Sequence, residues 1–277
     1  MQLLEGLTNE NYKVIDSKDG KKFEEGMNSK DVDYAAKESD VAIVSIGRSS
    51  TEGTDNYTME TTSEETALIK MVADKYHKVG KKVIVLLNIG APIETEDWKD
   101  YADAILVTWQ PGQEAGNAVA DVLSGEVNPS GKLTETFPVR YKDSPSYGNF
   151  PGSKETVYYG EGIYVGYRYY DTKGIKTQYP FGYGELNPNE TKTVTMEIDK
   201  RDLSYYDEIK KEWAAEPGKY TIKVGASSKD IKLELALKVI GNLDKYLVTE
   251  SSSWRVLQEN KNICKIVAKY VGYDAVI

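Results

Sequence analysis

The stretch that decides the fold is an apolar run followed at once by a small polar loop. The run is Val41-Ala42-Ile43-Val44-Ser45-Ile46-Gly47, and the loop after Arg48 is Ser49-Ser50-Thr51-Glu52-Gly53-Thr54-Asp55. A near-continuous apolar run of this length is typical of a strand in a parallel sheet, covered on both faces. Open α/β folds place their ligands at the carboxyl ends of such strands. Glu52 is therefore either a carboxylate that exchanges protons with a substrate or an ordinary solvated loop residue.

The residues that follow alternate between helix and strand patterns. A capping box at residues 62–65 and an apolar face made by Leu68, Ile69, Val72 and Tyr76 predict a helix that stops at Gly80. Further helices are predicted over residues 30–38 and 112–125. The predicted strands are residues 12–15, 41–47, 82–88, 104–109 and 132–137. Strands separated by helical stretches of this length indicate an α/β fold with a mostly parallel sheet, an α/β sandwich.

The second half of the chain has a different pattern. Residues 141–184 are rich in Gly, Tyr, Ser and Pro and have no sustained period, so we expect a long ordered connection. Four later segments alternate polar and apolar residues, which predicts a small antiparallel β-sandwich: 191–198, 212–216, 219–225 and 232–240. Apolar residues at helical spacing predict a packing helix between residues 251 and 277. The predicted domains are residues 1–140 (α/β sandwich), 141–184 (connection), 185–241 (partial β-sandwich) and 242–277 (helical tail).

Composition excludes several classes of function. The 277 residues are 40% hydrophobic and 29% charged, as in soluble globular proteins, and the net charge of −9 argues against a nucleic-acid surface. No apolar run approaches the ~18 residues of a membrane helix. The single cysteine (Cys264) and the single histidine (His77) predict no disulfide, no metal site and no Ser-His-Asp triad, and we expect no cofactor. Because the first residues lack the layout of a signal peptide, a cytoplasmic location is favoured.

Four separated stretches carry a resemblance to a known family. In chain order they are residues 44–55, 82–94, 109–133 and 163–184, the last containing Ile163-Tyr164-Val165-Gly166-Tyr167-Arg168-Tyr169-Tyr170-Asp171. Their order and spacing resemble the C-terminal part of glycoside hydrolase family 3, the β-glucosidase and β-N-acetylglucosaminidase family. A later stretch, residues 217–228, resembles the closing strands of the fibronectin-III-like domain of that family. The expected fold is therefore an α/β sandwich followed by a partial fibronectin-III-like β-sandwich.

The resemblance implies a division of labour between domains. Family members carry a nucleophilic aspartate on a barrel domain, commonly in a Ser-Asp-Trp string, and an acid/base glutamate on a sandwich loop of the Ser-Gly-Glu-Gly-x-Asp type. Glu52 stands at the acid/base position, and we expect Asp55, Arg48 and Ser50 to contact the sugar. Asn56 stands where an arginine often follows in the family. The implied activity is that of a retaining, exo-acting β-glucosidase that acts on β-linked glucosides or oligosaccharides.

Other departures from the family pattern indicate a fragment. No Ser-Asp-Trp string is present, and Glu96-Asp97-Trp98 lies between two predicted strands rather than at the nucleophile position. The first sandwich strand of the family and its Gly/Ser-rich loop are expected before Leu3 and are absent, and the β-sandwich is shortened between Gly184 and Pro188. We therefore expect the barrel domain of the same enzyme as a partner and no activity from the chain alone. The alternative is a non-catalytic carbohydrate-binding or interaction module; an esterase is disfavoured because no Gly-x-Ser-x-Gly elbow occurs.

Overall fold

The computed structural model describes residues 6–7, 13, 28–49, 53, 56–153, 155–184, 191–198, 201–207, 211–240, 247–250 and 264–271. The chain divides into two units, Met1–Phe181 and Gly182–Ile277. The strand predicted at residues 12–15 lies, apart from Lys13, outside the described residues, and the predicted domain boundaries stay predictions.

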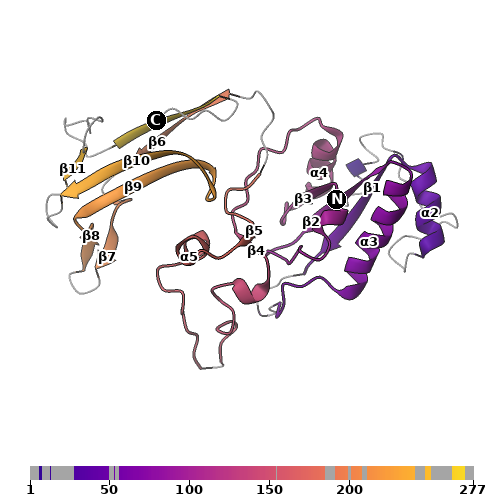
Figure 1. Ribbon diagram of the computed structural model, residues 1–277, viewed down its shortest axis with the longest axis horizontal. Helices are drawn as coiled ribbons and strands as arrows, with labels where there is room; N and C mark the ends of the chain where they lie inside the picture. The colour runs from indigo at the N-terminus through magenta and orange to yellow at the C-terminus, as the bar shows by residue number, and fades with distance from the viewer. Residues whose placement is uncertain are drawn as a thin grey trace. The chain divides into compact units, whose positions relative to one another are not determined.

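The first unit is built on a parallel sheet (Figure 1). Its strands are β1 (Val41–Gly47), β2 (Lys82–Asn88) and β3 (Ala104–Val107), hydrogen-bonded in the order β1-β2-β3. β1 and β2 pair in parallel from Val41 with Lys82 to Gly47 with Asn88, and β2 and β3 pair in parallel from Ile84 with Ala104. The predicted parallel arrangement of these three segments is confirmed. The predicted cover on both faces is wrong for β1, in which only alternate residues are buried and Val41 is 38% exposed.

The helices that accompany the sheet are α2 (Ser29–Glu38), α3 (Ser63–Lys78) and α4 (Ala115–Ser124). Side-chain capping boxes begin α2 and α3. The predicted capping box is present at α3, and Gly80 follows its end with a φ of +74°, a conformation that glycine adopts without steric cost. Figure 1 shows α2 and α3 side by side, with α4 apart from them. None of the helices in the described ranges is both long and apolar enough to cross a membrane.

The core of the first unit joins one face of the sheet to α3. Alternate residues of β1 and β2 are buried against the apolar face of α3 that the sequence predicts. Leu68, also in that face, is only partly buried. The buried residues include Ala42, Val44, Ile46, Val83, Val85, Leu87, Ile69, Val72 and Tyr76. Packing of α3 against β1 and β2 places the N-terminal turn of the helix near the carboxyl ends of both strands, as a β-α-β connection requires.

The strand predicted over residues 132–137 is wrong in extent and in partner. Only Phe137–Pro138 (β4) is a strand, and it pairs antiparallel with β5 (Thr177–Tyr179) in the predicted connection. Pro138 has no N–H to donate, which excludes it from the interior of a sheet. Phe137 is fully buried beside Trp109 and Tyr179. The connection also contains a short helix, α5 (Tyr167–Lys173).

The second unit is antiparallel, as predicted. Its strands are β6 (Thr191–Ile198), β7 (Tyr205–Asp207), β8 (Glu212–Ala214), β9 (Gly218–Ser227), β10 (Asp230–Ile240), β11 (Leu247–Glu250) and β12 (Cys264–Val271). They form a sheet of order β11-β10-β9 and the pairs β12-β6 and β7-β8. Val224, Leu237 and Val239 are buried and supply the apolar face that the alternation predicts.

The helix predicted for the C-terminal tail is wrong for residues 264–271. These residues form β12, which pairs antiparallel with β6 from Cys264 opposite Ile198 to Val271 opposite Thr191. Short apolar runs are ambiguous between helix and strand, and valine and isoleucine favour strands when an edge is available for pairing. The strand β11 (Leu247–Glu250) also lies within the tail predicted to be helical, residues 242–277, and the remaining residues of that tail lie outside the described residues.

Candidate active site at the carboxyl edge of the sheet

Three loops leave the sheet at the same edge, because parallel strands end together. They follow Gly47 of β1, Asn88 of β2 and Val107 of β3. The ladder continues one residue past the strands: Arg48 N donates to Asn88 O at 3.0 Å, and Thr108 N donates to Leu87 O at 2.9 Å. The loop after β1 is the one in which the sequence predicts a catalytic glutamate.

Arg48, the first residue of this loop, is bound to Glu65 of α3. Arg48 Nη1 donates to Glu65 Oε1 and Nη2 donates to Glu65 Oε2, each at 2.6 Å. The side chains are only 21% and 26% exposed. The hydrogen bond raises the pKa of Arg48 and lowers that of Glu65. Part of the hydrogen-bonding capacity that was predicted to serve a sugar is therefore used within the protein, since Nη1 also donates to Gly47 O at 2.9 Å.

Glu65 also closes the N-terminus of α3. Its Oε2 accepts from Thr62 N at 2.8 Å, and Thr62 Oγ1 accepts from Glu65 N at 3.1 Å. These are the two bonds of the capping box that the sequence predicts. The sequence does not predict that the same carboxylate binds Arg48, because no local pattern connects residues so far apart.

The loop after β3 turns away from the sheet at Trp109. This residue has a φ of +52°, which is uncommon for any residue but glycine. Two contacts hold the turn: Asn88 Nδ2 donates to Trp109 O at 2.6 Å, and the Trp109 ring lies 6.0 Å from that of Phe137. This turn ends β3 at Val107, two residues before the predicted end of the strand.

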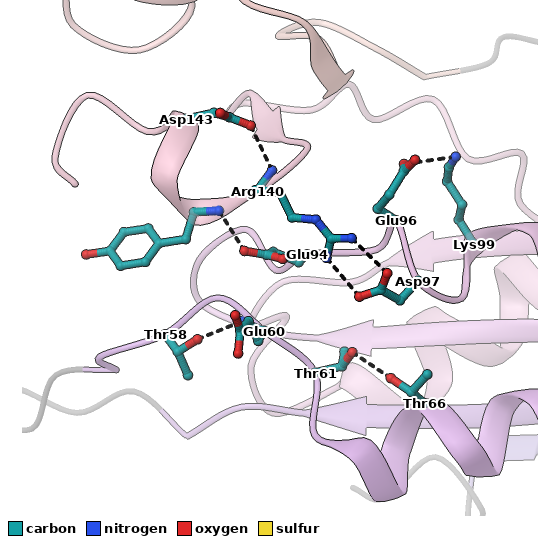
Figure 2. Close-up of polar contacts among 11 residues, drawn as sticks. Thr58, Glu60, Thr61, Thr66, Glu94, Glu96, Asp97, Lys99, Arg140 and Asp143 are labelled. Carbon is teal, nitrogen blue, oxygen red and sulfur yellow. Dashed lines mark hydrogen bonds and ion pairs between the residues drawn. The ribbon is translucent and has the colours of Figure 1, made fainter.

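The loop after β2 carries a buried carboxylate, Glu94, which is 6% exposed (Figure 2). Its carboxylate accepts from Tyr141 N at 2.6 Å and from Arg140 Nη1 at 3.0 Å. Its backbone N donates to Met59 O at 2.7 Å. Glu94 thus connects Met59, near the end of the loop that follows β1, to Tyr141 in the turn that follows β4. The sequence signals this role only by a carboxylate placed after an apolar run.

Asp97 is held by the same arginine. Arg140 Nη1 and Nη2 each donate to Asp97 at 2.8 Å, as Figure 2 shows. The pKa of Arg140 is raised by Asp97 first and Glu94 second, and Arg140 lowers the pKa of Asp97. A carboxylate engaged through both oxygens by an arginine is poorly suited to attack a substrate, which agrees with excluding Asp97 as the nucleophile.

Comparison with known proteins assigns the family. The model of the glycosyl hydrolase family 3 C-terminal domain matches residues 2–167, and that of the fibronectin type III-like domain matches residues 181–228. This chain belongs to glycoside hydrolase family 3. It carries the C-terminal domain of that family and a fibronectin type III-like region, as the sequence resemblance implies.

Relatives within family 3 extend well beyond this chain. Thermostable β-glucosidase B of Acetivibrio thermocellus is 36% identical, over 74% of this chain and 36% of its own length. An exo-α-(1→6)-L-arabinopyranosidase of Bifidobacterium longum is 31% identical, over 84% of this chain and 39% of its own length. The structure of β-glucosidase 3B from Thermotoga neapolitana in complex with glucose matches at 33% identity and a TM-score of 0.70, covering 85% of this chain and 46% of that protein. The chain spans less than half the length of these relatives.

The family 3 site residues predicted from the sequence are only partly placed. Ser50, Glu52 and Asp55 lie outside the described residues, whereas Arg48 is placed at the carboxyl edge and bound to Glu65. Gly53, next to Glu52, has a φ of +82°, a conformation that other residues adopt only with strain.

Proposed function

We propose that the chain is the C-terminal part of a retaining, exo-acting β-glucosidase in which Glu52 is the general acid/base. The observation that carries the proposal is the position of β1 in a domain that matches the family 3 C-terminal model. This strand ends at the carboxyl edge of a parallel sheet, directly before the loop that contains Glu52. Ligands of open α/β folds bind at this edge. The anchoring of the loop at both flanks supports a catalytic role, because catalytic groups need fixed positions.

The chemistry needs a second carboxylate. Retaining glycosidases use two carboxyl groups about 5–5.5 Å apart. The nucleophile attacks the anomeric carbon while Glu52 donates its proton to the departing glycosidic oxygen. Glu52 then removes a proton from the water that displaces the nucleophile and releases the sugar. We assign the nucleophile to the barrel domain of the full enzyme, and assign Asp55, Ser50 and Arg48 to contacts with the sugar.

The alternative function is a non-catalytic carbohydrate-binding or interaction module. It requires no nucleophile, whereas the catalytic function places the Ser-Asp-Trp string that this sequence lacks on the barrel domain. Both proposals place a sugar near the same loop, but only the first requires proton transfer by Glu52.

An assay of the purified chain, with and without an added barrel domain, separates the two functions. On nitrophenyl β-glucoside we expect no measurable turnover by the chain alone and turnover after the barrel is added. An aryl α-L-arabinopyranoside is the second substrate to test, because one relative is named for that activity. An assembly that binds glucose but turns over neither substrate would favour the non-catalytic module. Turnover by the chain alone that is lost in Glu52→Gln would reveal a second catalytic carboxylate within it.

A further inference from the structure

We propose that Glu65 is a positioning residue for the loop that carries Glu52. Its carboxylate joins the first residue of the loop, Arg48, to Thr62, the N-cap residue at which the loop meets α3. The inference rests on the proposed acid/base role of Glu52. It assigns to Glu65 a function in catalysis without contact to the substrate.

Three donors converge on the two oxygens of Glu65. Oε1 accepts from Arg48 Nη1 at 2.6 Å, and Oε2 accepts from Arg48 Nη2 at 2.6 Å and from Thr62 N at 2.8 Å. The arginine pair uses two parallel bonds, a geometry that fixes orientation as well as distance. One side chain thus sets where the loop leaves β1 relative to where it enters α3.

The two flanks of the loop depend on different contacts. The end that leads into α3 has further support, because Met59 O accepts from Glu94 N at 2.7 Å and the Oγ1 atoms of Thr61 and Thr66 lie 3.0 Å apart. Figure 2 shows the Thr61–Thr66 contact in the same view as the Glu94 cluster, which is made by Glu94, Asp97 and Arg140. The described contacts of Arg48 beyond its neighbour Gly47 are the backbone bond to Asn88 and the ion pair with Glu65. Loss of Glu65 should therefore release mainly the start of the loop, the part nearest Glu52 in sequence.

The energetics separate positioning from general stability. Partly exposed ion pairs contribute little to folding, because solvent screens them and ordering the side chains costs entropy. A catalytic group displaced by about 1 Å, in contrast, can lose about 100-fold in rate. We therefore expect Glu65 variants to affect proton transfer much more than folding.

The test compares Glu65→Ala and Glu65→Gln with a matched control in an assembly of this chain with the barrel domain. The control is Asp33→Ala, which removes a different ion pair of α3: Lys75 Nζ lies 2.8 Å from Asp33 Oδ1, between α2 and α3. For Glu65→Ala we expect kcat/KM on cellobiose to fall by about 10- to 100-fold. The fall on dinitrophenyl glucoside should be smaller by about 5-fold or more, because a good leaving group needs little protonation, whereas a lost contact between Arg48 and the sugar would lower both rates alike.

Two further readouts distinguish positioning from a merely structural role. Glu65→Gln keeps an oxygen acceptor for Thr62 N or for one arginine N–H, so it should recover part of the cellobiose activity. Asp33→Ala should leave the ratio between the two substrates unchanged. An equal fall on both substrates in Glu65→Ala, or no fall on either, would overturn the proposal.

Hydrogen exchange on the 277-residue chain alone tests the loop independently of catalysis. Amides of residues 48–62 should exchange faster in Glu65→Ala than in the parent chain or in Asp33→Ala. Unchanged exchange would show that Glu65 does not hold the loop. Glu52→Gln is assayed in parallel: if it keeps full activity on cellobiose, the proposed function fails, while the exchange result still decides whether Glu65 holds the loop.

Discussion

At each end of the parallel sheet, one carboxylate accepts hydrogen bonds from both a basic side chain and a backbone N–H. At the carboxyl edge, Glu65 accepts from Arg48 and from the backbone N–H of Thr62. At the amino edge, Asp103 gathers Lys82 Nζ at 2.7 Å and the backbone N of Val83 at 2.8 Å, and His77 Nε2 lies 2.8 Å away. Both side chains are about equally shielded, with 26% and 22% exposed.

The difference lies in what each carboxylate connects. Asp103 binds the start of β2 to the start of β3, where Asp103 N also donates to Val83 O at 2.8 Å, so it reinforces strands that are already adjacent. Glu65, in contrast, links the two ends of the long loop between β1 and α3. The two carboxylates have similar contacts but should differ in consequence: loss of Asp103 should affect stability, and loss of Glu65 should affect activity.

The largest effect is expected at Glu52. In an assembly with the barrel domain, Glu52→Gln should lower kcat/KM on cellobiose by about 10²- to 10⁴-fold and leave dinitrophenyl glucoside nearly unaffected. Azide should raise the turnover of the variant on the activated substrate, because a small anion attacks the glycosyl intermediate without a general base. Full cellobiose activity in Glu52→Gln, together with its loss in Asp55→Asn, would move the acid/base role to Asp55.

The next effect is a loss of stability at the loop after β2, where contacts at the same edge are structural. Arg140→Ala removes the partner of the buried Glu94 and leaves its carboxylate with the Tyr141 N–H. We expect a loss of about 2 kcal/mol in the free energy of unfolding, less than for a fully buried pair because Arg140 is partly exposed. Urea denaturation of the chain measures it. Arg168→Ala, at an exposed position of α5, is the control and should be close to neutral; an equally neutral Arg140→Ala would contradict a structural role for the Glu94 cluster.

At the amino edge, the comparison predicts a change in stability alone. Asp103→Ala leaves the N–H of Val83 without its side-chain acceptor and should cost about 1–2 kcal/mol of unfolding free energy. In the assembled enzyme, the ratio of kcat/KM between cellobiose and dinitrophenyl glucoside should stay at the parent value. A shift in that ratio comparable to that of Glu65→Ala would remove the distinction between the two edges.

The smallest effect is a pH dependence of stability. The pKa of Asp103 lies below its ordinary value, chiefly because of the hydrogen bond from Lys82 and then that from Val83 N. A carboxyl whose pKa is lowered by folding stabilises the protein above its unfolded pKa, and the contribution is lost as pH falls through the folded value. Unfolding free energy should therefore decline between about pH 5 and pH 2, by less than about 1 kcal/mol for this partly exposed group. Asp103→Asn should show a shallower decline; an identical slope would contradict the assignment.

Local patterns in the sequence were sufficient where the interaction partners are neighbours along the chain. The capping box of Thr62 and Glu65 and the apolar face of α3 involve residues three or four positions apart, so helix geometry alone brings them together. The continuous apolar character of β1 and β2 likewise predicted their parallel pairing. The helix predicted from such a pattern is wrong for residues 264–271. Their apolar run suits a helix or a strand, and pairing with β6 makes it a strand.

The sequence by itself determined the family, the parallel sheet and the loop that contains Glu52. Only the tertiary structure decided that Arg48 binds Glu65, that Glu94 binds Arg140, that Trp109 turns the chain out of the sheet and that Phe137 pairs with the later connection. The physical reason is distance along the chain. Local patterns record preferences of backbone and burial, whereas contacts between distant residues exist only after the strands have been placed beside one another.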